Sequence, residues 1–157
     1  MKISLICIGK TDAGYLRAGI SEYSQRISRY LSFEIIDIPE LKNVSSYSGS
    51  QIKEKEAEIL MKKWPAAAFT VLLDEHGKEF RSVEFAGFLQ GRMNMGIKHL
   101  VFIIGGSYGF SEEVIKKSDY QLSLSKMTFS HQLVRLLFTE QLYRSMTILR
   151  NEPYHNE

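Results

Sequence analysis

Residues 100–113, LVFIIGGSYGFSEE, decide the fold of this chain. Residues 100–104 form an uninterrupted apolar run, which is typical of a strand that is buried on both faces of a parallel sheet. A glycine-rich segment breaks the run. Ser111 then supplies a helix N-cap, followed by Glu112 and Glu113, which suit the positive end of a helix. The stretch therefore predicts a strand, a loop and a helix start in immediate succession.

The same alternation continues in both directions along the chain. Short apolar runs predict strands at residues 2–8, 33–38, 69–73, 100–104 and 120–124. Apolar side chains spaced by three and four residues predict helices at 13–30, 51–63, 83–95, 111–117 and 129–150. Strands that alternate with helices indicate an α/β fold with a mostly parallel sheet of roughly five to six strands and helices on both faces.

Length and composition restrict the class of protein. The chain has 157 residues, 44% apolar and 24% charged, which predicts one globular domain covering residues 1–157. No apolar run approaches the roughly 20 residues of a membrane span, and the apolar start is a first strand and not a signal peptide. The lone Cys7 predicts a buried thiol, as in a reducing cytoplasm. A net charge of +2 is too small to bind duplex DNA by charge alone. We therefore expect a cytoplasmic protein without a membrane or DNA partner.

The loops after the strands predict a ligand site. Ligands of such sheets bind outside the carboxyl ends of the strands, where residues 74–77, 105–109 and 125–128 are expected. A phosphate is disfavoured in the glycine loop, because Glu112 and Glu113 occupy the helix end that it would need and no lysine follows the glycines. The loop is either a structural turn or a site for a nucleoside without phosphate. S-adenosylmethionine, with its adenosine, carboxylate and sulfonium cation, is such a ligand.

Two clusters of polar side chains border this edge. Asp74, Glu75 and His76 follow a strand, where turn chemistry is a stronger explanation than catalysis. His131 and Arg135 are four residues apart and so lie on one face of the first turn of the last helix. They form either a structural pair or one border of the ligand loop.

The end of the chain carries two further signals. Apolar residues surround nearly the whole circumference of the helix at 129–150, and one sheet covers only one side of it. A partner subunit in a two-fold dimer would supply the second cover. The tail, residues 151–157, reads NEPYHNE, whereas disordered tails are poor in aromatics. Tyr154 and His155 therefore predict a tail that closes over a ligand.

Several pieces of this sequence together carry a family resemblance: Leu73-Asp74, the Gly105-Gly106 loop, the run from Leu122 to Thr128, His131 and Arg135, and Pro153-Tyr154-His155. They resemble the SPOUT-class methyltransferases that methylate a pseudouridine of bacterial 23S ribosomal RNA. The resemblance implies a C-terminal trefoil knot that binds S-adenosylmethionine, a homodimer, and methylation of N3 of the pseudouridine on assembled ribosomes. The cofactor contacts that it implies are Leu73, Gly105, Gly106, Leu124, Ser125, Lys126, Met127, Thr128 and Phe129.

The resemblance also suggests roles for the polar residues. It places Tyr154 and His155 near the target base, with Tyr154 orienting the base. N3 must lose a proton, and the ordinary pKa of histidine, about 6.5, makes His155 the candidate general base. His131, Arg135 and Arg144 are the candidate RNA contacts. The family pattern has a basic residue where this chain has Asn156. The tail of this chain therefore departs from the family in lacking that positive charge.

Two other functions are consistent with the sequence. One is a non-enzymatic ribosome-associated binding protein with the same fold. The other is a flavodoxin-like nucleotide protein, which the two glutamates after the glycine loop disfavour. Binding of S-adenosylmethionine separates the methyltransferase from both.

Overall fold

The computed structural model describes residues 1–156. Its elements, in chain order, are β1 (Lys2–Ile8), α1 (Gly14–Ile27), β2 (Ser32–Ile38), the short 3-10 turn η1 (Val44–Ser46), α2 (Gly49–Lys62), β3 (Phe69–Glu79), α3 (Ser82–Asn94), β4 (His99–Ile104), α4 (Glu112–Lys117), β5 (Tyr120–Ser123) and α5 (Leu133–Leu149). The expected alternation of strands and helices is confirmed, with most boundaries shifted by one to three residues. No helix within the described residues is long and apolar enough to cross a membrane.

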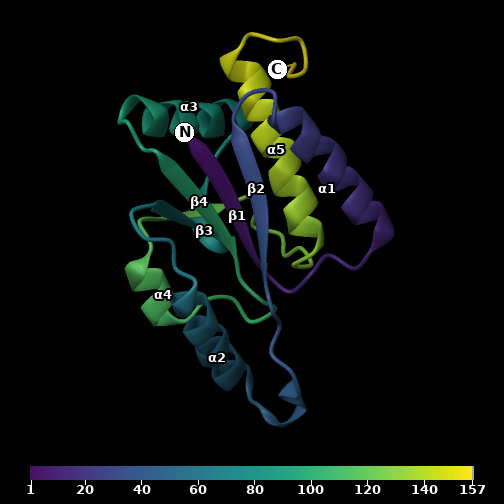
Figure 1. Cartoon of the computed structure of the whole chain (residues 1–157), viewed down its shortest axis with the longest axis vertical. Coiled ribbons are helices and arrows are strands. Elements are labelled where there is room, and N and C mark those ends of the chain that lie inside the picture. The colour runs from purple at the N-terminus through teal and green to yellow at the C-terminus, as the bar shows by residue number, and fades with distance from the viewer. Residues whose placement is uncertain (157) are drawn as a thin grey trace.

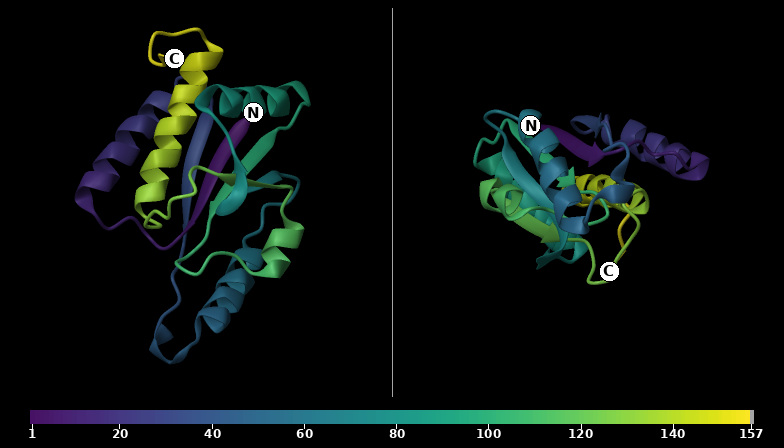
Figure 2. Two further views of the ribbon diagram at one scale, coloured as in Figure 1. Left: turned by 180° about the vertical axis from the view of Figure 1, so that it is seen from behind. Right: turned by 90° about the horizontal axis from the view of Figure 1, so that it is seen from below.

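The sheet has five strands in the order β2-β1-β4-β3-β5, and every neighbouring pair is parallel. Alternate side chains of each inner strand enter two separate cores, so that Leu5 and Phe102 lie in one, and Ile6 and Ile103 in the other. Helices α1, α3 and α5 cover the first face, and α2 and α4 cover part of the second (Figures 1 and 2). The apolar runs of the inner strands follow from this double burial.

Strand β3 extends further than its apolar run predicts. The expected strand ended at residue 73, but pairing with β5 resumes at Lys78 after an irregularity between Leu73 and Lys78. Gly77 makes this possible, because a Cβ there would lie 2.6 Å from backbone atoms of Leu122. The intervening residues, 74–76, bulge out of the ladder and face the carboxyl edge of the sheet.

Helix α5 begins later than expected, at Leu133 and not at residue 129. The Ser130 hydroxyl accepts a hydrogen bond from the Leu133 N–H at 3.2 Å, which favours a turn before the helix. Residues 129–132 consequently belong to the loop between β5 and α5. The helix lies across the sheet between α1 and α3, so much of its apolar circumference is covered within its own chain. The apolar pattern alone therefore does not require a partner subunit.

Candidate functional site

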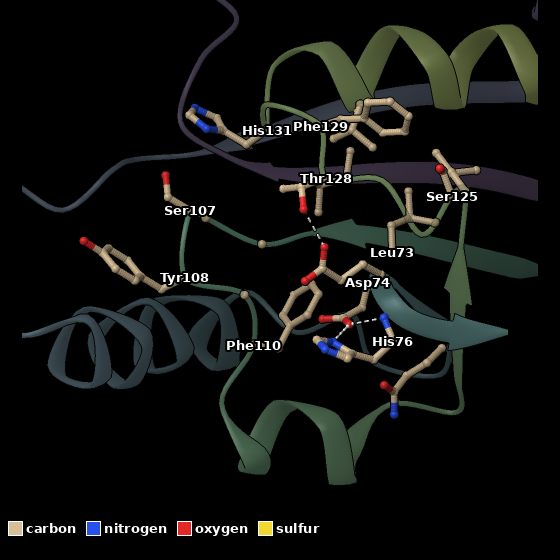
Figure 3. A pocket seen from close by; sticks show the side chains of 18 of the residues that line it. Leu73, Asp74, His76, Ser107, Tyr108, Phe110, Ser125, Thr128, Phe129 and His131 are labelled. Carbon is tan, nitrogen blue, oxygen red and sulfur yellow. Dashed lines mark hydrogen bonds and ion pairs between the residues drawn. The ribbon is translucent and has the colours of Figure 1, made fainter. Parts of the chain in front are cut away.

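A pocket of about 490 Å³ opens at the carboxyl edge of the sheet. It is formed by the ends of β3, β4 and β5 with the loops that follow them, so the three segments expected at one edge do meet there (Figure 3). Its size is within the usual range for small-molecule sites. The expected cofactor residues that line it are Leu73, Gly105, Gly106, Leu124, Ser125, Met127, Thr128 and Phe129.

Lys126 is the expected cofactor contact that does not line the pocket. Its side chain is 85% exposed, and its amine lies 3.7 Å from a carboxylate oxygen of Glu79. The neighbouring backbone is held in place by Ser125, whose Oγ accepts the Met127 N–H at 2.9 Å, while Ser123 donates to the Ser125 carbonyl. This tight turn presents the main chain of the loop to the pocket.

Hydrogen bonds join the β3 bulge to the opposite loop. Thr128 donates its hydroxyl to Glu75 at 2.9 Å, which links two walls of the pocket (Figure 3). The Asp74 carboxylate accepts the backbone N–H of His76 and contacts its Nδ1, both at 2.8 Å. The His76 side chain is 81% exposed, so this cluster is largely the turn chemistry that the sequence favoured.

The glycine loop packs closely against its neighbours. Gly109 has φ +74° and donates its N–H to the Gly106 carbonyl at 3.1 Å. A Cβ at Gly106 would lie 2.3 Å from the Glu56 carboxylate. The first turn of α4 carries Glu112 and Glu113, as expected. Acidic side chains therefore flank both sides of the loop and would repel a phosphate.

No sequence pattern singles out Glu56, which lies behind the glycine loop on α2. Its Oε2 is buried without a hydrogen-bond partner among residues 1–156, and desolvation together with nearby Glu40 raises its pKa. Lys53, one turn earlier on the same helix, lines the pocket, as does Tyr108. Glu56 and Lys53 lie in the helix predicted at 51–63, and the apolar spacing that predicts this helix says nothing about its polar side chains. Tyr108 lies in the glycine-rich loop at 105–109, where the glycines alone indicate a turn or a ligand loop.

His131 and Arg135 have different environments. His131 lines the pocket, as the sequence suggested. Arg135 is completely buried, and it donates to the carbonyls of His131 (3.1 Å) and Ile8 (2.8 Å) and to the Thr11 hydroxyl (3.0 Å). The expectation that Arg135 contacts RNA phosphate is therefore wrong, because its guanidinium joins three segments of the protein interior.

The tail is folded against helices α1 and α5 of its own chain. Tyr154 donates to Glu140 at 3.0 Å, its hydroxyl lies 3.3 Å from that of Tyr23, and its ring packs edge-on against Tyr143. Burial, Tyr23 and Glu140 raise the pKa of Tyr154, which keeps the phenol neutral. The tail is thus an ordered part of the fold.

Arg144 and His155 meet beside this tyrosine. Arg144 is bound to Glu140 at 2.6 Å, lies over the Tyr154 ring, and approaches Nδ1 of His155 at 3.4 Å. The hydrogen bond to Glu140 raises the pKa of Arg144. Nε2 of His155 is buried and has no partner within residues 1–156. None of the described tail residues lines the pocket of the same chain.

Comparison with known proteins identifies the family. The family model described as "Predicted SPOUT methyltransferase" matches residues 1–155. The chain belongs to this family. Two relatives called Ribosomal RNA large subunit methyltransferase H align with this SPOUT methyltransferase over the full length of both chains. The protein of Parabacteroides distasonis is 55% identical over 157 residues, and that of Bacteroides thetaiotaomicron is 50% identical.

Solved structures support the same fold for this SPOUT methyltransferase. A probable methyltransferase from Bordetella pertussis superposes with a TM-score of 0.55 at 10% identity, covering 92% of this chain and 96% of its own. A probable methylase family protein from Haemophilus influenzae gives a TM-score of 0.52 at 12% identity, covering 95% and 66%. At these identities the likeness concerns the fold alone.

Proposed function

We propose that this protein transfers a methyl group from S-adenosylmethionine to N3 of a pseudouridine in 23S ribosomal RNA, on assembled ribosomes in the cytoplasm. The observation that carries the proposal is the end-to-end identity of about half of all residues with relatives named as methyltransferases of large-subunit ribosomal RNA. The pocket at the edge of the sheet is the proposed cofactor site.

The pocket has the chemistry that this cofactor needs. Leu73, Ile104, Leu124 and Phe129 offer apolar contact for the adenosine, and three loops offer backbone donors and acceptors. Carboxylates such as Asp74 line the pocket, and they favour a sulfonium cation over a phosphate. NAD and FMN, which both carry phosphate, should bind poorly.

S-adenosylmethionine supplies an electrophilic methyl group, so the protein contributes mainly orientation, which can be worth roughly 7–11 kcal/mol. His155 is the proposed acceptor of the N3 proton, because an imidazole commonly serves as a general base. Tyr154, a neutral phenol, would orient the base.

A second copy of the chain would bring the tail to the pocket. Pocket residues His131 and Val134 stand at the start of α5, whereas the tail follows its last residue. The helix has 17 residues and is therefore about 25 Å long. We propose a two-fold homodimer in which the tail of each chain serves the pocket of the other. The trefoil knot stays a prediction from the family resemblance.

Cofactor binding and methylation test the function directly. Calorimetry should detect S-adenosylmethionine, and a concentration of 100 times its Kd should stabilise the fold by about 2.7 kcal/mol. Ribosomes from a strain that lacks the modification should gain one methyl group on the pseudouridine, detected by mass spectrometry of the RNA. A thermal shift with NAD or FMN and none with S-adenosylmethionine would contradict the proposal. Cofactor binding without methylation would favour the non-enzymatic binding protein.

Mixing two inactive variants tests the shared site. One variant, His155→Ala, lacks the tail base, and the other, Gly106→Ala, has a distorted pocket. If each pocket uses the partner's tail, mixed dimers contain one intact site and methylation should return to a sizeable fraction of the wild-type rate. Sedimentation must show that subunits exchange. Exchange without any recovery of activity would mean that the tail serves its own chain.

A further inference from the structure

The proposed reaction requires RNA contacts around the pocket, and two of the expected contacts have other partners. Arg135 is completely buried, and Arg144 is paired with Glu140. RNA held as a single strand is usually bound by exposed aromatic rings together with unpaired cations. The proposed function therefore requires an exposed aromatic ring and an unpaired cation at the mouth of the pocket.

Tyr108 stands at this mouth with its side chain 54% exposed. Figure 3 shows it beside Ser107 and across the pocket from Leu73 and Ser125. The tyrosine thus faces the ends of β3 and β5 from the opposite wall, on the same loop as the proposed cofactor contacts Gly105 and Gly106. A single exposed aromatic ring is common in proteins and does not by itself indicate a binding site. Neighbouring residues that hold the ring in an exposed position are stronger evidence for a binding role.

Helix α2 makes room for this ring at Gly49. A Cβ on Gly49 would lie 2.7 Å from Cδ1 and 2.8 Å from Cε1 of Tyr108. Glycine is unfavourable in helices, and the helix end is already capped by Ser48, which accepts the Gln51 N–H at 3.2 Å. The glycine therefore has a packing reason: it lets the ring rest on the helix with its other side open.

A free cation lies close to the ring. Lys53 is four residues after Gly49, hence on the same side of α2, and it lines the pocket. Within residues 1–156 the lysines found in ion pairs are Lys2, Lys116 and Lys126, so Lys53 has no carboxylate partner. Its amine is available to an anion that enters from outside.

We propose that Tyr108 is a stacking platform for a nucleobase of the ribosomal RNA strand that enters the pocket, and that Lys53 holds a phosphate of the same strand. This inference rests on the proposed function and names the residues that bind its RNA substrate. Any base can stack on an aromatic ring, and a lysine binds phosphate through charge. The pair would increase affinity for the strand without taking part in methyl transfer.

Steady-state kinetics with ribosomes test the platform. Tyr108→Ala should raise the KM for ribosomes about 10-fold or more, while kcat and the Kd of S-adenosylmethionine stay near wild type. Tyr108→Phe should retain the wild-type KM, because only the ring is needed. Tyr15→Ala is the matched control, since Tyr15 is 76% exposed and does not line the pocket.

A second variant displaces the ring without removing it. Gly49→Ala should preserve or raise the melting temperature, because alanine favours a helix, yet it should raise the KM for ribosomes as Tyr108→Ala does. Lys53→Gln should reduce the slope of log KM against log salt by roughly 0.7, the value for one phosphate contact with a single strand.

The outcomes separate this inference from the proposed function. Ribosomes left unmethylated by the wild type would overturn both. Wild-type methylation together with an unchanged KM in Tyr108→Ala would overturn the stacking platform alone. An equal weakening of S-adenosylmethionine binding would place Tyr108 in the cofactor site, which also overturns it.

Discussion

Arg135→Met should destabilise the protein strongly, although the sequence suggested an RNA contact. The substitution keeps a long side chain and removes the guanidinium. That group makes three hydrogen bonds, to the carbonyls of His131 and Ile8 and to the Thr11 hydroxyl, and lies 4.0 Å from Asp37. Each of these bonds joins a charged donor to the protein, and such bonds are worth about 1.5–3 kcal/mol each.

The expected loss is smaller than the sum of the bonds, because the variant no longer buries a charge. Removal of one partner from a buried charged network typically costs about 3–5 kcal/mol. At about 2–4 °C per kcal/mol for a chain of this size, the melting temperature should fall by about 6–20 °C. Urea titration and thermal melting both measure this loss. Arg150→Met, at an exposed position just after the same helix, should change stability by less than about 0.5 kcal/mol.

The opposite result would refute the reasoning. If Arg135→Met melted like the wild type but bound ribosomes more weakly and with a lower salt dependence, Arg135 would be a phosphate contact. Its burial between β1 and α5 would then not describe the protein in solution.

Three further predictions follow from local geometry. Gly77→Ala should disrupt the pairing of β3 with β5 and abolish cofactor binding, because its Cβ would meet backbone atoms at 2.6 Å. Gly87→Ala, whose Cβ would have no atom within 4 Å, should instead stabilise α3 by about 0.4–1 kcal/mol in denaturant titrations. Gly106→Ala should weaken S-adenosylmethionine binding in calorimetry, and adding Glu56→Ala should restore part of it by removing the carboxylate 2.3 Å away. Cys7 should resist thiol reagents at pH 8 until the protein unfolds, because burial raises its pKa to about 12; rapid labelling of the native protein would contradict this.

The sequence by itself determined the layers of the fold and the edge of the sheet at which the pocket lies. Uninterrupted apolar runs such as residues 100–104 can only be buried on both sides, so they implied a parallel sheet covered by helices. Parallel strands end at one edge, which placed the loops at 105–109 and 125–128 together before their contacts were known. The glutamates after the glycine loop disfavoured a phosphate on the charge at one helix end, which is also a local property of the sequence.

The tertiary structure alone decided which polar side chains face the pocket. The helical spacing put His131 and Arg135 on one face. In the structure, however, Arg135 points towards β1 and donates a hydrogen bond to the carbonyl of Ile8, which is 127 positions away in the chain. The contact depends on the strand order, and periodicity within a helix carries no information about it. The same holds for Lys53, whose helix comes from the opposite side of the sheet.

The tail shows the same difference between what the sequence indicates and what the tertiary structure decides. Its composition predicted a segment that closes over a ligand, whereas in the structure Tyr154 packs against α1 and α5 of its own chain. Composition did not show that the tail would lie away from the pocket of its own chain, at the far end of a 17-residue helix. Local chemistry determines which residues can form a site, whereas only the path of the chain in three dimensions determines which of them meet.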